Sequence, residues 1–544
     1  MTVVVTQDAS SISVPNDAAT DLPPQITDFP ADPVIDGNSV PASAPGLFTD
    51  TPVRASGSPC IVSPMPGTLM PMNWLRPRFE FLPTGQDNLF EITVTVPGFA
   101  HALRIYTQGD SAHAWRSGAL TYVLDSILWA QLSAWVVDTS IGVAIRSMSV
   151  SAAGAVQAGP SPAATSSFTI APVAAPGKIV YWALSNSSTA QSTGLLKGFG
   201  IGEEGVEDVL EPGQVSGINS SNDGCIGCHT ATPDGLSVGM VMGPPESNIG
   251  LDTYYEWLVD IQPTSLGSVP SYAAPTAISS LRSIRGGAPT FSAAHWSDGD
   301  HIELTSNDNG ELTWTKLDAP SQQGQITRTG DSNYASSPAW SHDGSTIAYV
   351  SSAGTSSIHD GRFAQGPADI YLVPYDNQQG GSATPLQGAS DPSNTQYYPA
   401  FSPDDSLIAF TSFVTGNNPV AYGAGGGVNS AAEVFVVPAS GGTRQRLAAN
   451  DPPACLTDLA SPGITNDWPK WSPQVASAGG KSYYWLTFSS TRSGRAQLFV
   501  TAIVSSGGTL SLSPALYLWN QPSDEDNHTP SWDNWQIPPV TVVD

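Results

Sequence analysis

The sequence predicts an all-β protein in three parts: an extended N-terminal segment, a β-sandwich and a set of repeated antiparallel sheets. Two observations lead to this prediction. The 544-residue chain is rich in turn formers, with 52 Gly and 47 Pro, and its apolar and polar residues alternate in short runs, as in half-buried strands. Its second half also repeats one sequence phrase, which indicates a fold built from like units.

Composition excludes several classes of function. Only 12% of the residues are charged, and 47 acidic against 19 basic residues give a formal net charge of −28, so we expect no nucleic-acid partner. No apolar run approaches the roughly 18 residues of a membrane span, so no transmembrane segment is expected. The N-terminus lacks the pattern of a signal peptide. The acidic, lysine-poor composition favours an exported chain at the cell surface, in the periplasm or outside the cell, with its leader absent from this numbering.

The first two parts differ in their sequence pattern. Residues 1–72 are rich in Pro, Ser and Ala without periodicity, which is typical of an extended arm or linker; such an arm could also bridge copies of the chain. Residues 73–174 contain strand-like runs such as NLFEITVTV and GVAIRSMSVSA, and predict a sandwich of immunoglobulin or fibronectin type. Apolar residues at helical spacing over 128–135 predict one short helix within it.

The repeat is clearest in SSPAWSHDGSTIAYVSS (336–352) and YYPAFSPDDSLIAFTS (397–412). Each unit has a Pro-x-aromatic-Ser phrase, usually followed by a tight turn and an alternating strand. This phrase resembles the blade repeat of TolB-type β-propellers, and the resemblance implies that residues 175–544 form a propeller of about six blades. The start of the sandwich is similar to a module that precedes such propellers in exported bacterial proteins. The anchor prolines of the repeat are Pro289, Pro338, Pro399, Pro469 and Pro530.

The stretch DGCIGCHTATPDG (223–235) carries the chemistry. Aligned with the repeat, it becomes a divergent first blade, in which Cys228 and His229 take the places of Ser337 and Pro338. That register predicts that the motif enters an inner strand at the mouth of the propeller channel.

Cys225, Cys228 and His229 form the C-x-x-C-H spacing of a c-type haem site, in which two thiols add to vinyl groups and the following imidazole ligates iron. In a chain with four Cys and eight His, chance would give it on the order of a few times in ten thousand. We therefore expect one covalent haem c. Two alternatives stay open: a redox disulfide or dithiol of Cys225 and Cys228, and a zinc half-site.

The second axial ligand is less defined by the sequence. His528 is the preferred candidate, because it aligns with the motif on the last blade, which neighbours the first in a closed ring. Met240 and Met242 are alternatives that share one strand face, although a core role suits them better. An open, five-coordinate iron is a further possibility. The other histidines of the propeller fall in turns or loops where solvated side chains are common: His295, His301, His342 and His359.

These observations favour an exported mono-haem cytochrome that exchanges electrons with a redox partner protein. The alternative is a haem-free surface-binding or structural propeller, and a third class is a haem enzyme with an open iron. No nucleophile elbow, P-loop or zinc-protease motif occurs, so no catalytic residue is assigned. The acidic runs GEEGVED and DEDN read as solvated surface rather than calcium sites. Cys60 and Cys455 are a candidate disulfide in an oxidising compartment.

Overall fold

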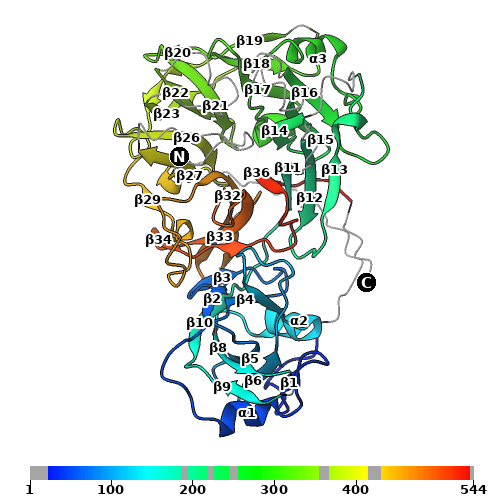
Figure 1. The fold of residues 1–544 in the computed structure, drawn as a ribbon. Helices are drawn as coiled ribbons and strands as arrows, with labels where there is room; N and C mark the ends of the chain where they lie inside the picture. The colour runs from blue at the N-terminus through cyan, green and yellow to red at the C-terminus, as the bar shows by residue number, and fades with distance from the viewer. Residues whose placement is uncertain are drawn as a thin grey trace, which may run out of the picture.

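The computed structural model describes residues 22–152, 154–184, 194–217, 225–243, 255–285, 287–320, 322–353, 367–414 and 431–538. Strands dominate this part of the chain, so the all-β prediction is confirmed. Figure 1 shows two bodies, a smaller one from the N-terminal residues and a larger one from the rest. No described helix is long and apolar enough to cross a membrane.

The smaller body is a sandwich of two sheets. The large sheet is formed, in spatial order, by β1 (Val34–Ile35), β6 (Leu103–Thr107), β5 (Leu89–Thr95), β8 (Ser140–Val150), β10 (Ala164–Ile170) and β3 (Thr68–Met70), with β9 (Val156–Ala158) beside β8. The small sheet is formed by β2 (Cys60–Ser63), β4 (Arg78–Leu82) and β7 (Leu120–Val123). Their inner faces meet in an apolar core, in which the rings of Phe81 and Phe90 lie 4.7 Å apart.

The short helix expected near residue 130 is α2 (Ser126–Trp135). The side chain of Asp125 caps its N-terminus by accepting hydrogen bonds from the backbone N–H groups of Ile127 and Leu128. Trp129 is buried and its indole N–H donates to the carbonyl oxygen of Trp74 at 3.0 Å. The helix therefore closes one end of the sandwich core.

The expectation of an extended arm over residues 1–72 is wrong for the part that the structure describes. Residues 22–72 contribute β1, β2, β3 and the helix α1 (Ala44–Asp50) to the sandwich. Phe48 of α1 is buried against Tyr106, with their ring centroids 5.6 Å apart. These strands are two to four residues long and lack periodicity, so pairing with distant strands forms them rather than local sequence. Residues 1–21 lie outside the described residues.

The larger body is a closed ring of six strand groups, which we number as blades; a pairing of Gly194 with Cys225 joins blades 1 and 2 into one sheet. Blade 1 consists of β36 (Asp526–Asp533), β11 (Lys178–Leu184), β12 (Gly194–Gly200) and β13 (Glu207–Leu210). Blade 2 consists of β14 (Cys225–Ala231), β15 (Ser237–Gly243) and β16 (Tyr255–Asp260). Blade 3 consists of β17 (Ile302–Ser306), β18 (Leu312–Lys316) and β19 (Gln323–Gln325). Blade 4 consists of β21 (Tyr334–Trp340), β22 (Thr346–Ser352), β23 (Ala368–Pro374) and β25 (Thr384–Pro385). Blade 5 consists of β26 (Asn394–Phe401), β27 (Leu407–Val414), β28 (Glu433–Pro438) and β29 (Gln445–Arg446). Blade 6 consists of β30 (Asn466–Trp471), β32 (Lys481–Ser490), β33 (Gln497–Ser506) and β34 (Thr509–Leu512).

Short elements complete the ring. Blade 3 also carries α3 (Pro275–Leu281) and α4 (Ala293–Ser297), and its innermost residue pair is the bridge between Thr290 and Leu304. The minor strands are β20 (Arg328–Thr329) with β24 (Gly381–Ser382), and β31 (Ala476–Ala478) and β35 (Leu516–Tyr517) in blade 6.

The ring is closed by the C-terminal strand. β36 pairs with β11, so blade 1 joins the two ends of the propeller sequence, as Figure 1 shows beside the label β11. The blade with the C-x-x-C-H motif is therefore the second along the chain, not the first as expected, because β11, β12 and β13 form a blade before it. The expectation that His528 lies on a blade next to the motif is correct, since β36 contacts β14.

Five inner strands share one irregularity at the place of the anchor proline. Each ladder shifts register there, and the residue before the anchor adopts a left-handed backbone conformation. A positive φ costs a non-glycine residue about 1 kcal/mol or more, so its recurrence marks a feature that the fold imposes. These residues are Cys228 (φ 40°), Ser337 (46°), Tyr398 (54°), Trp468 (55°) and Thr529 (48°). The alignment of Cys228 with Ser337 is therefore confirmed.

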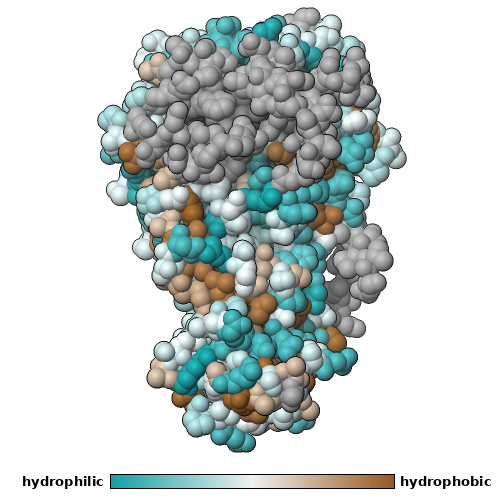
Figure 2. Space-filling view, in the orientation of Figure 1, coloured by the Kyte–Doolittle hydropathy of each residue, from teal (hydrophilic) through white to brown (hydrophobic). Residues whose placement is uncertain are grey.

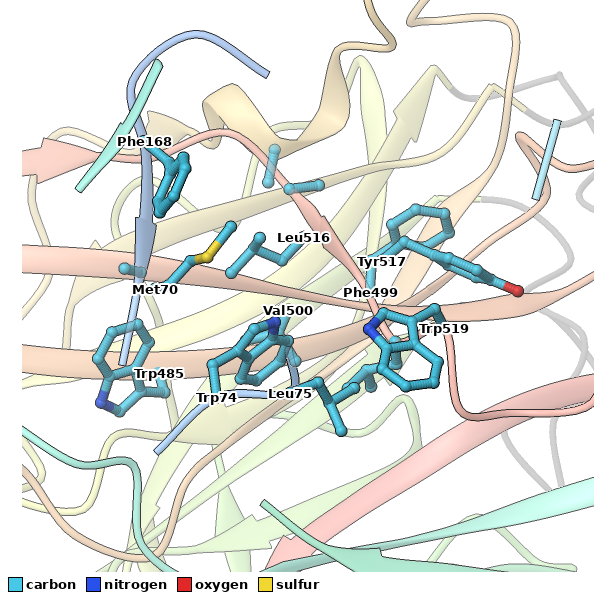
Figure 3. Close-up of a cluster of buried hydrophobic side chains, with 14 of the residues drawn as sticks. Met70, Trp74, Leu75, Phe168, Trp485, Phe499, Val500, Leu516, Tyr517 and Trp519 are labelled. Carbon is cyan, nitrogen blue, oxygen red and sulfur yellow. The ribbon is translucent and has the colours of Figure 1, made fainter. Parts of the chain in front are cut away.

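The sandwich and the propeller share one hydrophobic core. Met70, Trp74 and Leu75 of the sandwich pack among propeller residues that include Trp485 and Tyr517 (Figure 3). A disulfide between Cys60 and Cys455 links the same two bodies, with Cα atoms 5.6 Å apart. On the face shown in Figure 2, brown apolar residues gather near this junction, whereas hydrophilic residues cover much of the sandwich. The two bodies are thus fixed to one another by packing and by a covalent bond.

Candidate cofactor site in the axial channel

The C-x-x-C-H motif forms the inner strand of blade 2. Cys225 begins β14 opposite Gly243, and the ladder is regular up to Gly227 opposite Val241. It then bulges at Cys228 and resumes at Thr230. The side chain of Cys225 lies outside the described part of the chain.

His229 is buried between blades 2 and 1. Its side chain is 5% exposed, and its Nε2 lies 3.2 Å from the carbonyl oxygen of Val180 on β11. Its Nδ1 is also buried and has no hydrogen-bond partner among the described residues. Burial lowers the pKa of His229 to about 4, so the imidazole is neutral at pH 7. One ring nitrogen held by a backbone carbonyl and the other left open is the usual arrangement of a metal-ligating histidine.

Cys228 lies in an apolar cluster beside this imidazole. The cluster comprises Cys228, Trp182, Leu184 and Val241, with Trp468 packed against it. Cys228 is 9% exposed, so its thiol is shielded from bulk solvent. The surroundings are therefore apolar on the side of the motif that faces blade 1.

His528, the preferred second ligand, lies opposite Trp182 in the β11–β36 ladder. It is buried, and its ring packs perpendicular to the Trp182 ring with centroids 4.1 Å apart. Trp182 thus belongs both to the cluster around Cys228 and to the contact with His528. The structure thus places His528, on β36 of blade 1, beside the motif on β14 of blade 2, and Trp182 of β11 contacts both His528 and the Cys228 cluster.

Met240 and Met242 are core residues of blade 2. Both are buried, and they pack in an apolar cluster with Ile226, Val180 and Trp535. Met242 lies directly opposite Ile226 in the ladder. Met240 and Met242 therefore have the core role that the sequence favoured for them.

The remaining propeller histidines are held in blades 3 and 4. His295 Nε2 lies 3.1 Å from the Gly344 carbonyl oxygen, His301 faces Asp318, and His342 Nδ1 lies 2.9 Å from Asp405. His359 lies outside the described residues. Within the described ranges, no group of three or more His, Cys, Asp and Glu side chains is arranged to hold a metal ion.

Two hollows occupy the propeller axis and together form what we call the axial channel. The first, about 50 Å³, lies beside the motif and is lined by Cys228, His229 and the residues around the bulges of neighbouring blades. The second, about 170 Å³, opens towards the turns that follow the inner strands. Three residues line both hollows: Thr230, Thr290 and Lys470. The motif therefore lies at one mouth of a channel, as the register predicted.

Lys470 and Asp533 are channel residues that the sequence analysis missed. Lys470 follows the anchor Pro469, where the other blades carry Thr, Ala or Ser, and Asp533 stands four residues after the bulge, where most blades carry Ser or Thr. Burial lowers the pKa of Lys470, whereas it raises the pKa of Asp533. The aligned repeat could have revealed both residues, because each is a charged residue at a repeat position where the other blades carry small side chains.

Comparison with known proteins finds no matching family and no matching curated protein. Among solved structures, TolB from Agrobacterium tumefaciens is similar over 65% of this chain and 98% of its own, at 14% identity and a TM-score of 0.29. An oligogalacturonate lyase from Vibrio parahaemolyticus is similar over 60% and 71%, at 11% identity and a TM-score of 0.28. Kuenenia stuttgartiensis hydrazine synthase is similar over 48% and 75%, at 14% identity and a TM-score of 0.24.

Proposed function

We propose that the chain is an exported c-type cytochrome that carries one haem on Cys225, Cys228 and His229. A single observation carries the proposal. At the position where blades 3 to 6 and β36 place a proline, blade 2 places an imidazole directly after a cysteine, and one of its buried nitrogens has no described partner. A buried, unsatisfied nitrogen costs about 1–3 kcal/mol, which a bound ligand would recover.

The donor types, two thiols and a neutral imidazole, are those that hold a haem c. His229 is neutral, as ligation requires, and its other nitrogen is held by Val180. The adjacent hollow of about 50 Å³ has room for roughly one or two water molecules, so it does not enclose a porphyrin. In this proposal Cys225 and Cys228 would hold the haem covalently and His229 would bind its iron. When bound, a haem c supplies one-electron transfer.

The surroundings of Cys228 suit such a role. Trp182, Leu184 and Val241 keep water from one side of the site, and exclusion of water is one of the means by which a protein sets a reduction potential. His528 remains the candidate for the second axial position, with Trp182 between it and Cys228. A vacant second position, which would admit small molecules, is the alternative.

The proposal includes an exported location and a redox partner protein. The disulfide between Cys60 and Cys455 supports the location, because such bonds persist mainly in oxidising compartments. Covalent haem attachment to C-x-x-C-H would take place in the same kind of compartment. The competing function is a haem-free binding or structural propeller, in which the motif cysteines serve only the fold.

The experiment compares two pairs of cysteine changes. The chain is produced in an exporting host with c-type maturation, and covalent haem is detected by peroxidase staining of the denatured polypeptide. Changing Cys225 and Cys228 to Ala should remove the stain, while the matched change of Cys60 and Cys455 to Ala should keep it. Unstained wild-type polypeptide would overturn the proposal in favour of the haem-free function.

A further inference from the structure

The axial channel is lined by one residue from each blade, the residue that follows the anchor proline or, in blade 2, His229. Five of these residues are small, and the sixth is a lysine. All six line the 170 Å³ hollow: Thr230, Thr290, Ala339, Ala400, Lys470 and Ser531. Lys470 also lines the smaller hollow, so its side chain belongs to the middle of the channel rather than to one mouth.

Lys470 has no ion pair or hydrogen bond to any side chain or carbonyl in the described ranges. Lys470 is half-buried, and an ammonium group partly removed from water is stabilised by an anion or by several acceptors. The groups that face it electrostatically are Asp533, Cys228 and His229. Of these, Asp533 and Cys228 carry a negative charge when ionised, whereas the His229 imidazole is neutral.

Asp533 is already engaged by other donors. Its Oδ2 accepts a hydrogen bond from the Ser531 hydroxyl, and the backbone of Ala231 donates to the same carboxylate. His342, at the mouth of the larger hollow, is held by Asp405 on the neighbouring blade. Among the described residues that line the channel, Lys470 is therefore the one cationic side chain that is not hydrogen-bonded to a carboxylate.

We infer that the axial channel binds a small oxyanion, a carboxylate or phosphate group, on Lys470 with help from the hydroxyls of Thr230 and Thr290. The larger hollow is similar in volume to a cavity of about 150 Å³ that accommodates benzene, so the ligand is a small molecule or a single anionic group of a larger one. A flexible ammonium suits phosphate as a point charge, and the small neighbouring side chains leave room for the oxygens.

The residues of this site are different from those that would hold the proposed haem. The cation and hydroxyls of the site come from blades 2, 3 and 6 and open to the face opposite the start of β14. Binding is therefore measured on the full chain, with or without haem, and its failure would leave the cytochrome proposal untouched.

The test is isothermal titration calorimetry with inorganic phosphate and, separately, with succinate. Wild-type protein should bind at least one of the two, and Lys470→Met should weaken that binding by about tenfold or more, as expected for loss of a charged hydrogen-bond donor. Lys316→Met is the matched control, because Lys316 pairs with Asp300 at 3.0 Å away from the channel, and it should bind like wild type.

A second variant keeps the test decisive if Lys470→Met does not fold. Ala339→Glu places a carboxylate in the same ring of channel residues, where it would pair with Lys470 and block the anion. It should abolish binding while the near-ultraviolet circular dichroism stays that of wild type. Absence of binding of both probes to wild type, or equal binding by the folded variants, would overturn the inference.

Discussion

Nε2 of His229 lies 3.2 Å from the carbonyl oxygen of Val180, and this contact joins the inner strand of blade 2 to the second strand of blade 1. Proline holds the same repeat position in the other blades, for example Pro338 after the left-handed Ser337. The fold of a blade therefore does not require an imidazole there. His229 is a departure from the repeat for which a ligand is the physical explanation.

This departure predicts that His229→Pro preserves the fold. The backbone at Cys228 already has the conformation that precedes proline in blade 4, and the change removes a buried nitrogen without a described partner. In haem-free protein, the free energy of unfolding in urea should stay within about 1 kcal/mol of wild type. The converse change, Pro338→His, should destabilise by about 1–3 kcal/mol. A loss above about 3 kcal/mol in His229→Pro would show that the imidazole is structural.

His528→Ala tests the second axial position. If His528 ligates iron in the haem-loaded chain, its removal should convert a low-spin absorption spectrum into a high-spin one. Met240→Leu is the control, because Met240 is buried in the blade 2 core and its replacement should leave the spectrum unchanged. A low-spin spectrum that survives His528→Ala would exclude this ligand.

Glu80 lines the junction of the two bodies together with Tyr517 and Trp519, and it should make the stability of the protein sensitive to pH. It lies buried on β4, accepts a hydrogen bond from the Arg116 backbone at 2.9 Å, and burial raises its pKa to about 8. The folded protein thus keeps the proton up to about pH 8, whereas the unfolded chain releases it near the ordinary pKa of 4.5. The stabilisation is complete below pH 4.5 and is lost as the pH rises through about 8.

Glu80→Gln should remove this dependence. Between pH 4.5 and 8 the wild-type free energy of unfolding should fall relative to that of the variant, by up to about 4 kcal/mol. Urea unfolding of both proteins at several pH values measures the difference. A constant difference across the range would mean that Glu80 is ionised in the folded protein.

The disulfide between Cys60 and Cys455 should stabilise the junction. The bond spans a sequence separation of 395 residues, and removing a native disulfide typically costs about 2–5 kcal/mol. The double change of Cys60 and Cys455 to Ala should therefore lower the thermal midpoint, as measured by calorimetry. Because Trp74 and Tyr517 still pack across the junction, the two bodies should remain associated at lower temperature. An unchanged thermal midpoint would show that packing alone stabilises the junction.

The sequence repeat was sufficient to predict the blades and the place of the motif within one of them. It works because each inner strand carries the same bulge, so the alignment of Cys228 with Ser337 carries a backbone conformation with it. Two features of the fold could not be predicted from the repeat. The pairing of β36 with β11 joins segments more than three hundred residues apart, and the two- to four-residue strands of residues 22–72 form only through distant partners.

The site was predictable in its residue types but not in its contacts. C-x-x-C-H names the donors, whereas the partner of His229 is a backbone carbonyl, which no side-chain pattern can reveal. Trp182 between His528 and Cys228 depends on the register of two strands from opposite ends of the propeller. Lys470 is visible in the sequence once the anchor prolines are aligned, because it breaks a series of small residues.

The most direct test of the cytochrome proposal is the pyridine haemochrome spectrum of wild-type protein matured in an exporting host, recorded after extraction with acidified acetone. One haem per chain should stay with the polypeptide and give the spectrum of a thioether-linked haem. Colourless polypeptide after extraction, with all colour in the solvent or none at all, would contradict it.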